Sequence, residues 1–331
     1  MVTQNILTTA FKTVRFNLFW SNNKNKINDD FEPDDISIVT AFFDIRRENW
    51  GVNNKINMRH KRNVDDYLSY FSNLSKIKNQ LIIFIDENLA QQVLDMRIKS
   101  GLEGKTIIFS INNFFNHKEI SILKQRIQLI TNKEFLEYVW TPSAPEYNSP
   151  EYVLINAFKS FFACYAIENN VVDSPQLAWI DFGYCRDSDR FDISSKWRFN
   201  AKNKMNLFHI LPLDNEPIYK IIKQGDVYFQ GGHLIGDQNN WLFFRSEIDM
   251  SFCSLLDCNF IDDDQTLILM AYRRNPSFYI IHPVDSADWF IIFKNFNSSC
   301  NPPVVKLRKK RVRKSPLWWK EFKLWLRRTY E

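Results

Sequence analysis

The sequence has few of the residues that crosslink small secreted domains or build glycine-rich loops. Its five cysteines are odd in number, and no two have the C-x-x-C spacing of metal and redox sites. Cys164 and Cys253 lie in apolar surroundings, so we expect small core residues and a reducing compartment. Eight glycines in 331 residues leave no glycine-rich low-complexity segment.

Long hydrophobic runs are also missing. No uncharged apolar run reaches the roughly 20 residues that a helix needs to cross a bilayer. Residues 1–20 are partly apolar, but Lys12 and Arg15 interrupt them, and no small-residue cleavage site follows. We therefore expect neither an integral membrane protein nor a secreted one.

Positive charge is concentrated at the C-terminal end. The chain carries +5, while residues 306–331 hold eleven Lys or Arg and two Glu, which leaves −4 on the rest. Residues 306–314 are almost entirely basic. Beyond them, Trp318, Phe322 and Trp325 share one side of a predicted helix, with basic residues opposite.

Three partners are open for this tail: an anionic membrane surface, the protein's own core and nucleic acid. We favour the membrane, because each basic residue near an anionic leaflet contributes about 1 kcal/mol. Nucleic acid is not expected, since no recognised nucleic-acid module accompanies the basic run. We expect a cytoplasmic protein that is peripheral on the inner face of the cell membrane through residues 306–328.

Strand and helix patterns alternate through the first 180 residues. This alternation predicts βαβ units and a largely parallel sheet. The second half is less regular. The strands expected along the whole chain are 36–43, 81–85, 105–110, 177–181, 226–230, 241–245 and 278–282. The expected helices are 63–78, 87–99, 118–139, 151–167, 248–256 and 264–273.

Three predicted strands end in an acidic residue: Asp44, Asp86 and Asp181. Ligands of open α/β sheets bind outside the carboxyl ends of the strands, so these carboxylates are candidates for a shared site. Each also has a purely structural interpretation, because Asp is common after a strand as a helix cap or turn former. For Asp44 and Asp86 the two interpretations carry about equal weight.

Asp181 stands in Trp179-Ile-Asp-Phe-Gly183, where an apolar strand runs into a turn. A carboxylate there can hold a divalent metal that neutralises a diphosphate. The letters D-F-G also occur in protein kinases, but the H-R-D catalytic loop and the glycine-rich loop are missing. We therefore exclude a kinase.

Two later segments are further candidates. Gly231-Gly-His233 lets backbone approach a ligand closely, although an ordinary turn is slightly favoured from this segment alone. Asp262, Asp263, Asp264 and Gln265 precede a strongly apolar helix. They can cap that helix and complement its dipole, or face a cleft as general base or sugar ligands.

Two cations on predicted helices beside the sheet, Arg97 and Lys159, are candidates for diphosphate contacts. Each has the commoner alternative of a surface cation.

Taken in order, five motifs resemble the HtrL/YibB family of bacterial proteins, also described as WlaTC-like, over roughly residues 36–297. They are Thr40-Ala-Phe-Phe-Asp-Ile45, Trp179-Ile-Asp-Phe-Gly183, Trp197-Arg-Phe-Asn200, Gly231-Gly-His233 and Asp262-Asp-Asp-Gln-Thr-Leu267. Members are associated with bacterial surface-polysaccharide or lipooligosaccharide synthesis, and the motif order is similar to that of GT-A glycosyltransferases. The resemblance implies a single GT-A-like α/β domain, which we place at residues 36–300, between an arm and linker at 1–35 and the tail at 301–331.

The resemblance also implies roles for individual residues. Asp181 matches the first acid of D-x-D, which binds a divalent metal, Mn²⁺ or Mg²⁺, and His282 is a further metal ligand. Gly183 occupies the position of the second acid, for which Asp187 or Asp189 is a candidate replacement. Catalysis is expected at Asp263, Asp264 and Gln265. Donor binding is expected at Thr40, Ala41, Asp44, Arg97, Lys159, Asp181, Gly183, Gly231, Gly232 and His233.

We therefore expect a glycosyltransferase that moves a sugar from a nucleotide-diphosphate donor to a glycan or glycolipid of the bacterial surface. The alternative is a non-catalytic nucleotide- or carbohydrate-binding protein on the same fold, which the missing second acid supports.

Overall fold

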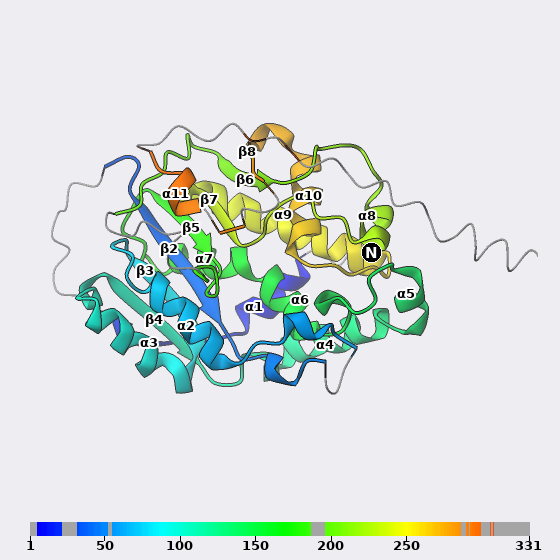
Figure 1. Cartoon of the computed structure of the whole chain (residues 1–331), viewed down its shortest axis with the longest axis horizontal. Coiled ribbons are helices and arrows are strands. Elements are labelled where there is room, and N and C mark those ends of the chain that lie inside the picture. Colours follow the sequence, from blue (N-terminus) through cyan, green and yellow to red (C-terminus); the bar gives the residue numbers. More distant parts are fainter. Residues whose placement is uncertain are drawn as a thin grey trace, which may run out of the picture.

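One central sheet of eight strands organises the described part of the chain (Figure 1). The computed structural model describes residues 5–21, 32–51, 55–186, 196–285, 289–290 and 292–298, together with Val305 and Leu307. The strand order is β1-β4-β3-β2-β5-β7-β6-β8. The strands are β1 (Asn17–Ser21), β2 (Ile36–Phe42), β3 (Leu81–Asp86), β4 (Thr106–Ile111), β5 (Gln176–Ile180), β6 (Met205–His209), β7 (His233–Asp237) and β8 (Tyr279–Pro283).

The middle of the sheet is parallel. β3 pairs in parallel with β4 and with β2, and β2 pairs in parallel with β5. β1 closes one edge antiparallel to β4, β7 runs antiparallel between β5 and β6, and β8 is parallel to β6. The predicted α/β class with a mixed, mostly parallel sheet is confirmed, and this sheet is consistent with the GT-A-like fold that the resemblance implies.

Continuous apolar runs explain why the parallel strands lie at the centre. β2 (ISIVTAF) and β4 (TIIFSI) are buried along their whole length, and β3 (LIIFID) is buried as far as Ile85. Such strands need cover on both faces, and helices provide it. The helices are α1 (Ile6–Lys12), α2 (Val64–Leu74), α3 (Glu87–Lys99), α4 (Lys118–Ile130), α5 (Lys133–Tyr138), α6 (Pro150–Ala157), α7 (Lys159–Glu168), α8 (Ile218–Gln224), α9 (Gln238–Asp257), α10 (Asp264–Arg274) and α11 (Ile292–Asn295).

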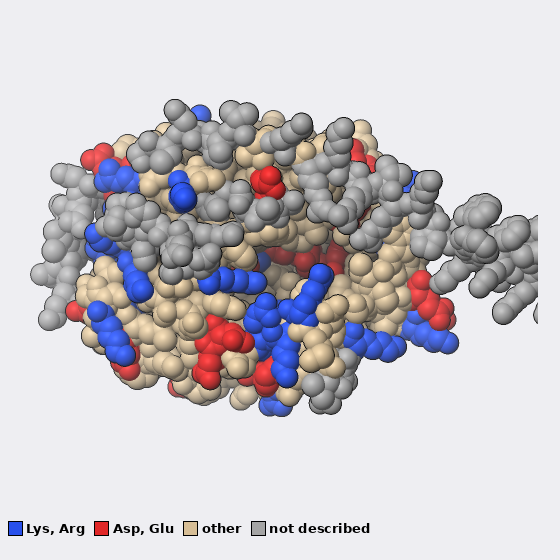
Figure 2. All heavy atoms as spheres, viewed as in Figure 1, with Lys and Arg blue, Asp and Glu red and all other residues tan. Residues whose placement is uncertain are grey.

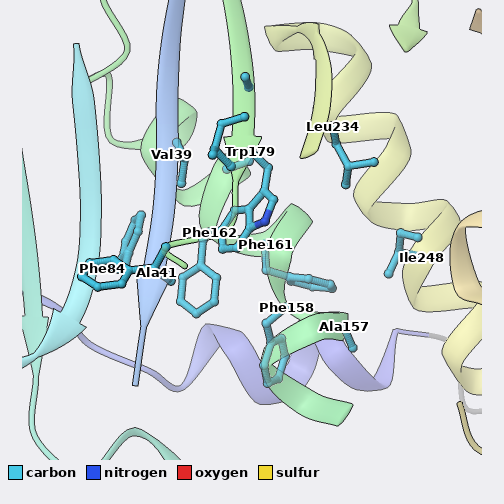
Figure 3. Packing of buried hydrophobic residues seen from close by; sticks show 14 of the residues in the cluster. Val39, Ala41, Phe84, Ala157, Phe158, Phe161, Phe162, Trp179, Leu234 and Ile248 are labelled. Atoms are coloured by element: carbon cyan, nitrogen blue, oxygen red, sulfur yellow. The ribbon is translucent and has the colours of Figure 1, made fainter. Parts of the chain in front are cut away.

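The strand register identifies the face that each helix covers. Ala41 of β2 pairs with Phe84 of β3, so these two side chains share a face and Phe42 points to the other one. On the first face α7 places the Phe162 ring 5.1 Å from that of Phe84 (Figure 3). On the second face α2 places Tyr67 4.7 Å from Phe42. Since helices cover both faces, the ends of the strands are where a ligand can reach the central sheet.

The N-terminal residues belong to this core. Leu7 and Phe11 of α1 are buried, and the Asp249 carboxylate of α9 accepts hydrogen bonds from the backbone N–H groups of Leu7 and Thr8, both at 2.9 Å. β1 then adds an edge strand to the sheet. Residues 5–21 of the expected arm thus contain α1 and β1, and the buried side chains of α1 pack on the domain.

In the part of the chain that the structure describes, no helix combines the length and apolar character needed to span a bilayer. Asp187 and Asp189 lie outside the described residues. The tail at residues 301–331 lies outside them as well, except for Val305 and Leu307. Its contact with a membrane surface stays a prediction from the sequence.

Candidate active site

A cavity of about 460 Å³ opens at the carboxyl ends of β2 and β5. The chain leaves β2 toward β3 and β4 and returns through β5 on the other side of β2, so the strand order reverses here. Ligands of open α/β sheets bind at such a point. The predicted site residues that line the cavity are Ala41, Asp44, Lys159, Asp181, Gly183, Gly231, Gly232, Asp263, Asp264 and Gln265. The structure thus brings most of the predicted site together, while their roles stay predictions.

Lys159, the first residue of α7, connects three of these groups. Its Nζ lies 2.9 Å from Asp181 Oδ1 and 2.8 Å from Asp264 Oδ2, and it donates to the Gly231 carbonyl oxygen at 2.9 Å. Burial lowers the pKa of the Lys159 ammonium, but the two carboxylates outweigh burial and hold the pKa above its ordinary value. The ammonium therefore stays charged, and each of its three N–H donors has a partner.

The glycine pair allows this close packing. A Cβ atom at Gly231 would lie 2.1 Å from Asp264 Oδ2, so only glycine leaves room for the carboxylate beside Lys159. A Cβ atom at Gly232 would lie 3.5 Å from Asp181 Oδ2, which is ordinary contact. The Gly232 carbonyl oxygen also accepts a hydrogen bond from the Asp181 N–H at 2.9 Å.

Asp263 is both a helix cap and a residue of the cavity, the two interpretations that the sequence left open. It caps α10 by accepting a hydrogen bond from the Gln265 N–H at 3.0 Å, and it also lines the cavity. Burial, followed by the charges of Asp264, Asp262 and Glu146, raises its pKa well above the ordinary range. Burial and Asp262 raise the pKa of Glu146 to about 8. A raised pKa makes the Asp263 carboxylate a stronger proton acceptor, the property that a general base needs.

Two predicted donor contacts from the first half of the sheet lie elsewhere. Thr40 is fully buried within β2 and is not among the residues that line the cavity. Arg97 is a fully buried residue of α3, and its Nε donates to Thr106 Oγ1 at 2.7 Å. Its other N–H groups donate to the carbonyl oxygens of Ser75, Ile77, Asn79 and Lys105. The prediction that Arg97 contacts a diphosphate is wrong, because the guanidinium is fully used in joining loops.

The two predicted histidines also lie outside the cavity lining. His233 is buried in β7 between aromatic rings, 4.4 Å from the Phe208 ring and 5.4 Å from that of Tyr184. Burial, followed by the charges of Lys159 and His282, lowers its pKa to about 3, so it stays neutral. His282 of β8 donates from Nε2 to Asn206 Oδ1 at 2.8 Å. These partners correct the predicted donor contact of His233 and the predicted metal ligation by His282.

The described residues do not fit the expected Mn²⁺ or Mg²⁺. Asp181 Oδ1 is bound by Lys159 Nζ at 2.9 Å and by Trp179 Nε1 at 2.8 Å, and His282 is committed to Asn206. Within the described ranges, no three His, Cys, Asp or Glu side chains are grouped so that they can hold a metal ion. Lys159 occupies the place beside Asp181 and Asp264 that a cation would take.

Sequence reasoning missed three arginines and several aromatic residues of the cavity. Those lining it are Arg47, Arg62, Arg186, Tyr67, Tyr152, Trp289 and Phe290. A signal was available for two of them, because Arg47 follows Asp44 by three residues and Arg186 follows Asp181 by five. A loop that begins at a strand-ending carboxylate lines the same edge of the sheet. Its basic residues are therefore candidates for the site just as its acidic residues are.

Asp86 of β3 lies next to the cavity and shifts the pH dependence of folding. Its Oδ2 accepts a hydrogen bond from the Asp44 N–H at 2.7 Å. Burial raises the pKa of Asp86 from 3.8 to about 6. The hydrogen bond from Asp44 lowers this pKa in part, and the Asp44 charge adds to the rise, within that value. The folded protein therefore binds more protons than the unfolded chain between these two pKa values, and its stability falls as the pH rises through this window.

We expect Asp86→Asn to remove this dependence. The variant should become more stable relative to the wild-type protein by about 2 kcal/mol as the pH rises from 4 to 7, since one pKa unit corresponds to about 1.4 kcal/mol. Denaturant unfolding across this pH range measures the difference. Asp95→Asn, at an exposed position of α3, is the control that should show no pH-dependent gain. A constant difference between wild type and Asp86→Asn would contradict the assignment.

Comparisons with known proteins identify relatives of the chain. A family model described as "Bacterial protein of unknown function (HtrL_YibB)" matches residues 34–298. Protein HtrL of Escherichia coli strain K12 is 32% identical over 271 residues, which cover 80% of this chain and 93% of that protein. The crystal structure of mouse xyloside xylosyltransferase 1 in its apo form is similar with a TM-score of 0.36 and 10% identity, over 82% of this chain and 100% of the other, a likeness too low to support an argument. The match to the family model and the bacterial relative show that the chain belongs to the HtrL/YibB family.

Proposed function

We propose that the protein is a glycosyltransferase that moves a sugar from a nucleotide-diphosphate donor to a hydroxyl of a bacterial surface glycan. The observation that carries this proposal is the cavity at the ends of β2 and β5. It combines a carboxyl of raised pKa, Asp263, with a separate group of three arginines. Sugar transfer needs both, since a proton must leave the acceptor hydroxyl and negative charge develops on the leaving diphosphate.

Each group of the cavity has a part in the proposed reaction. Asp263 accepts the proton of the acceptor hydroxyl, and the acceptor oxygen forms a bond to the anomeric carbon of the donor sugar. The bond between that carbon and the diphosphate oxygen breaks, and its electron pair leaves with the nucleoside diphosphate. Lys159 holds Asp181 and Asp264 in place beside Gly231, so the pocket wall next to the reacting groups is rigid. Asp44 contacts the nucleoside.

A nucleotide-binding or carbohydrate-binding protein without catalytic activity is the second candidate. The commitment of Asp181 and Asp264 to Lys159 favours it, because neither carboxylate is then free to act on a substrate. The two candidates differ in what they need from Asp263, which has no cation partner within hydrogen-bond distance in the described part of the chain.

Asp263→Asn separates these candidates. Asn keeps the size of the side chain and is as good a helix cap as Asp, so the fold and ligand binding should be retained. Loss of the proton acceptor should lower kcat by about 10²–10⁴-fold. The measurement is release of nucleoside diphosphate from a panel of UDP, GDP and dTDP sugars with a mixture of acceptor glycans, beside thermal shifts with the same donors.

One outcome counts against catalysis, and another against the role given to Asp263. Wild-type protein that binds a donor but never turns it over would favour the binding protein. Unchanged turnover in Asp263→Asn with an unchanged melting temperature would remove Asp263 as the base.

A further inference from the structure

Three arginines line the cavity without an acidic partner among the described residues. Arg47 begins the short helix Arg47–Asn49 after β2, Arg62 precedes α2, and Arg186 follows the turn at Gly183. None of the three forms an ion pair with a described carboxylate, whereas Arg273 and Arg274 on α10 both do. Figure 2 shows acidic atoms inside a hollow near the middle of this face, with basic side chains gathered along its lower edge. Negative charge therefore lies inside the cavity and positive charge along its edge.

The three arginines line the same cavity as Tyr67. Burial raises the pKa of the Tyr67 phenol, while Arg47, Arg186 and Arg62 lower it and Asp181 raises it further. The charges of all three arginines and of Asp181 thus act on the same phenol. The turn at Gly183, which precedes Arg186, packs closely against Tyr67 of α2. A Cβ atom at Gly183 would lie 2.9 Å from the Tyr67 ring.

The arginines are positioned but not saturated. Arg47 donates to the His60 carbonyl oxygen from Nη2 at 2.8 Å and to the Tyr67 hydroxyl, and its guanidinium lies 4.4 Å from the Trp50 ring centroid. Arg186 donates from Nε to the Gly183 carbonyl oxygen at 3.1 Å. A guanidinium has five N–H donors, so each of these keeps donors that have no partner among the described residues.

On the side of the cavity around Lys159, the described residues supply little positive charge that a phosphate could bind. Lys159 is fully bonded to Asp181, Asp264 and the Gly231 carbonyl, so its charge is neutralised where it lies. The described residues supply no divalent-cation site. Guanidinium groups bind phosphates through paired N–H donors and stay charged at all physiological pH values. Arg47, Arg62 and Arg186 are therefore the described lining residues that can balance the charge of a diphosphate in this cavity.

We propose that Arg47, Arg62 and Arg186 form a diphosphate-binding site that works without a divalent cation. This inference rests on the proposed function for the source of the diphosphate, the nucleotide-sugar donor. The arginines hold the diphosphate in the donor and balance the charge that it gains when the bond to the sugar breaks.

The test is calorimetric binding in EDTA to the full-length protein. The probes are pyrophosphate, the nucleoside diphosphates UDP, GDP and dTDP, and glucose 6-phosphate as a phosphate ester that carries no diphosphate. We expect pyrophosphate and at least one nucleoside diphosphate to bind, and Arg62→Gln and Arg186→Gln each to raise Kd roughly tenfold or more, since a charge-assisted hydrogen bond contributes about 1.5–3 kcal/mol. Arg59→Gln is the matched control. Arg59 is exposed on the same segment and is not among the cavity-lining residues, so its loss should leave Kd within about twofold.

The outcomes separate this inference from the proposed function. Nucleoside diphosphate binding that appears only with added Mn²⁺ would overturn the cation-independent site and leave the transferase proposal intact. Equal binding by wild type and both glutamine variants would overturn the arginine assignment. Tighter binding of glucose 6-phosphate than of any nucleoside diphosphate would overturn the assignment to the donor. Arginine-dependent binding of pyrophosphate with no sugar transfer would support the site and count against the transferase.

Discussion

Replacing Lys159 with methionine should destabilise the protein by about 3–5 kcal/mol at pH 7, the cost of leaving a buried carboxylate without its partner. The Lys159 side chain is 7% exposed and that of Asp264 is 8% exposed, so water cannot take over the role of the ammonium. Methionine fills a similar volume, so the loss measures charge and hydrogen bonding more than a cavity. Denaturant unfolding gives the free energy, and the same samples should show loss of sugar transfer.

The pH dependence of this loss identifies its cause. Burial already raises the pKa of Asp264, while Lys159 lowers it, so removing the ammonium must raise this pKa further. Below the ordinary pKa of 3.8 the carboxyl is protonated in both the folded and the unfolded state, and the penalty should then shrink toward zero. A penalty that does not change between pH 4 and pH 8 would mean that packing, not charge, is responsible.

Lys124→Met provides the comparison. Lys124 forms an ion pair with Glu151 at 2.6 Å, a shorter distance than those of Lys159, but both side chains are more than 20% exposed. Exposed ion pairs contribute about 0–1 kcal/mol, so this variant should lose less than 1 kcal/mol. Similar losses at the two positions would show that burial does not set the strength of the Lys159 interactions.

The sequence predicted best where one physical requirement dominates a segment. β2, β3, β4 and β5 were predicted because strands buried on both faces must be continuously apolar. The strand expected at 241–245 lies inside α9 instead. Its letters, WLFFR, suit either structure, and the choice is made by Asp237, whose side chain accepts a hydrogen bond from the Asn240 N–H at the start of the helix. β6 and β7 were missed because five-residue strands with Asn, His, Gly or Asp give no clear pattern.

The site was predictable for residues that directly follow strands and not for those whose partners come from elsewhere. Asp44 and Asp181 line the same cavity because the carboxyl ends of neighbouring parallel strands meet at one edge of the sheet. Arg97 looked like a free cation beside the sheet, since nothing in its own helix indicates the carbonyl oxygens that surround it. The contact of Lys159 with Asp264 joins residues 105 positions apart. Only the folded chain shows that these predicted ligands neutralise each other.

Replacing Gly231 with alanine should have the second large effect, although it adds only one methyl group. The new Cβ atom would lie 2.1 Å from Asp264 Oδ2 and 2.7 Å from Oδ1, so the carboxylate must move. Asp264 is held by Lys159 at 2.8 Å, and moving it breaks a buried ion pair. Overpacking of a buried site costs about 1–3 kcal/mol, and we expect a loss of stability at the upper end of this range together with loss of transfer.

Gly232→Ala is the adjacent control for this prediction. Its Cβ atom would make ordinary contacts of 3.5 Å with Asp181 Oδ2 and with the Tyr184 ring, so the fold should lose less than about 1 kcal/mol. Thermal and denaturant unfolding of both variants, with the Lys159→Met protein as reference, measure the difference. If Gly231→Ala destabilises because it displaces Asp264 from Lys159, then adding it to Lys159→Met should cost much less than it does alone, since the interaction is already lost. Full additivity of the two changes would mean that the glycine is required for another reason, and that the carboxylate can move without breaking its contact with the ammonium.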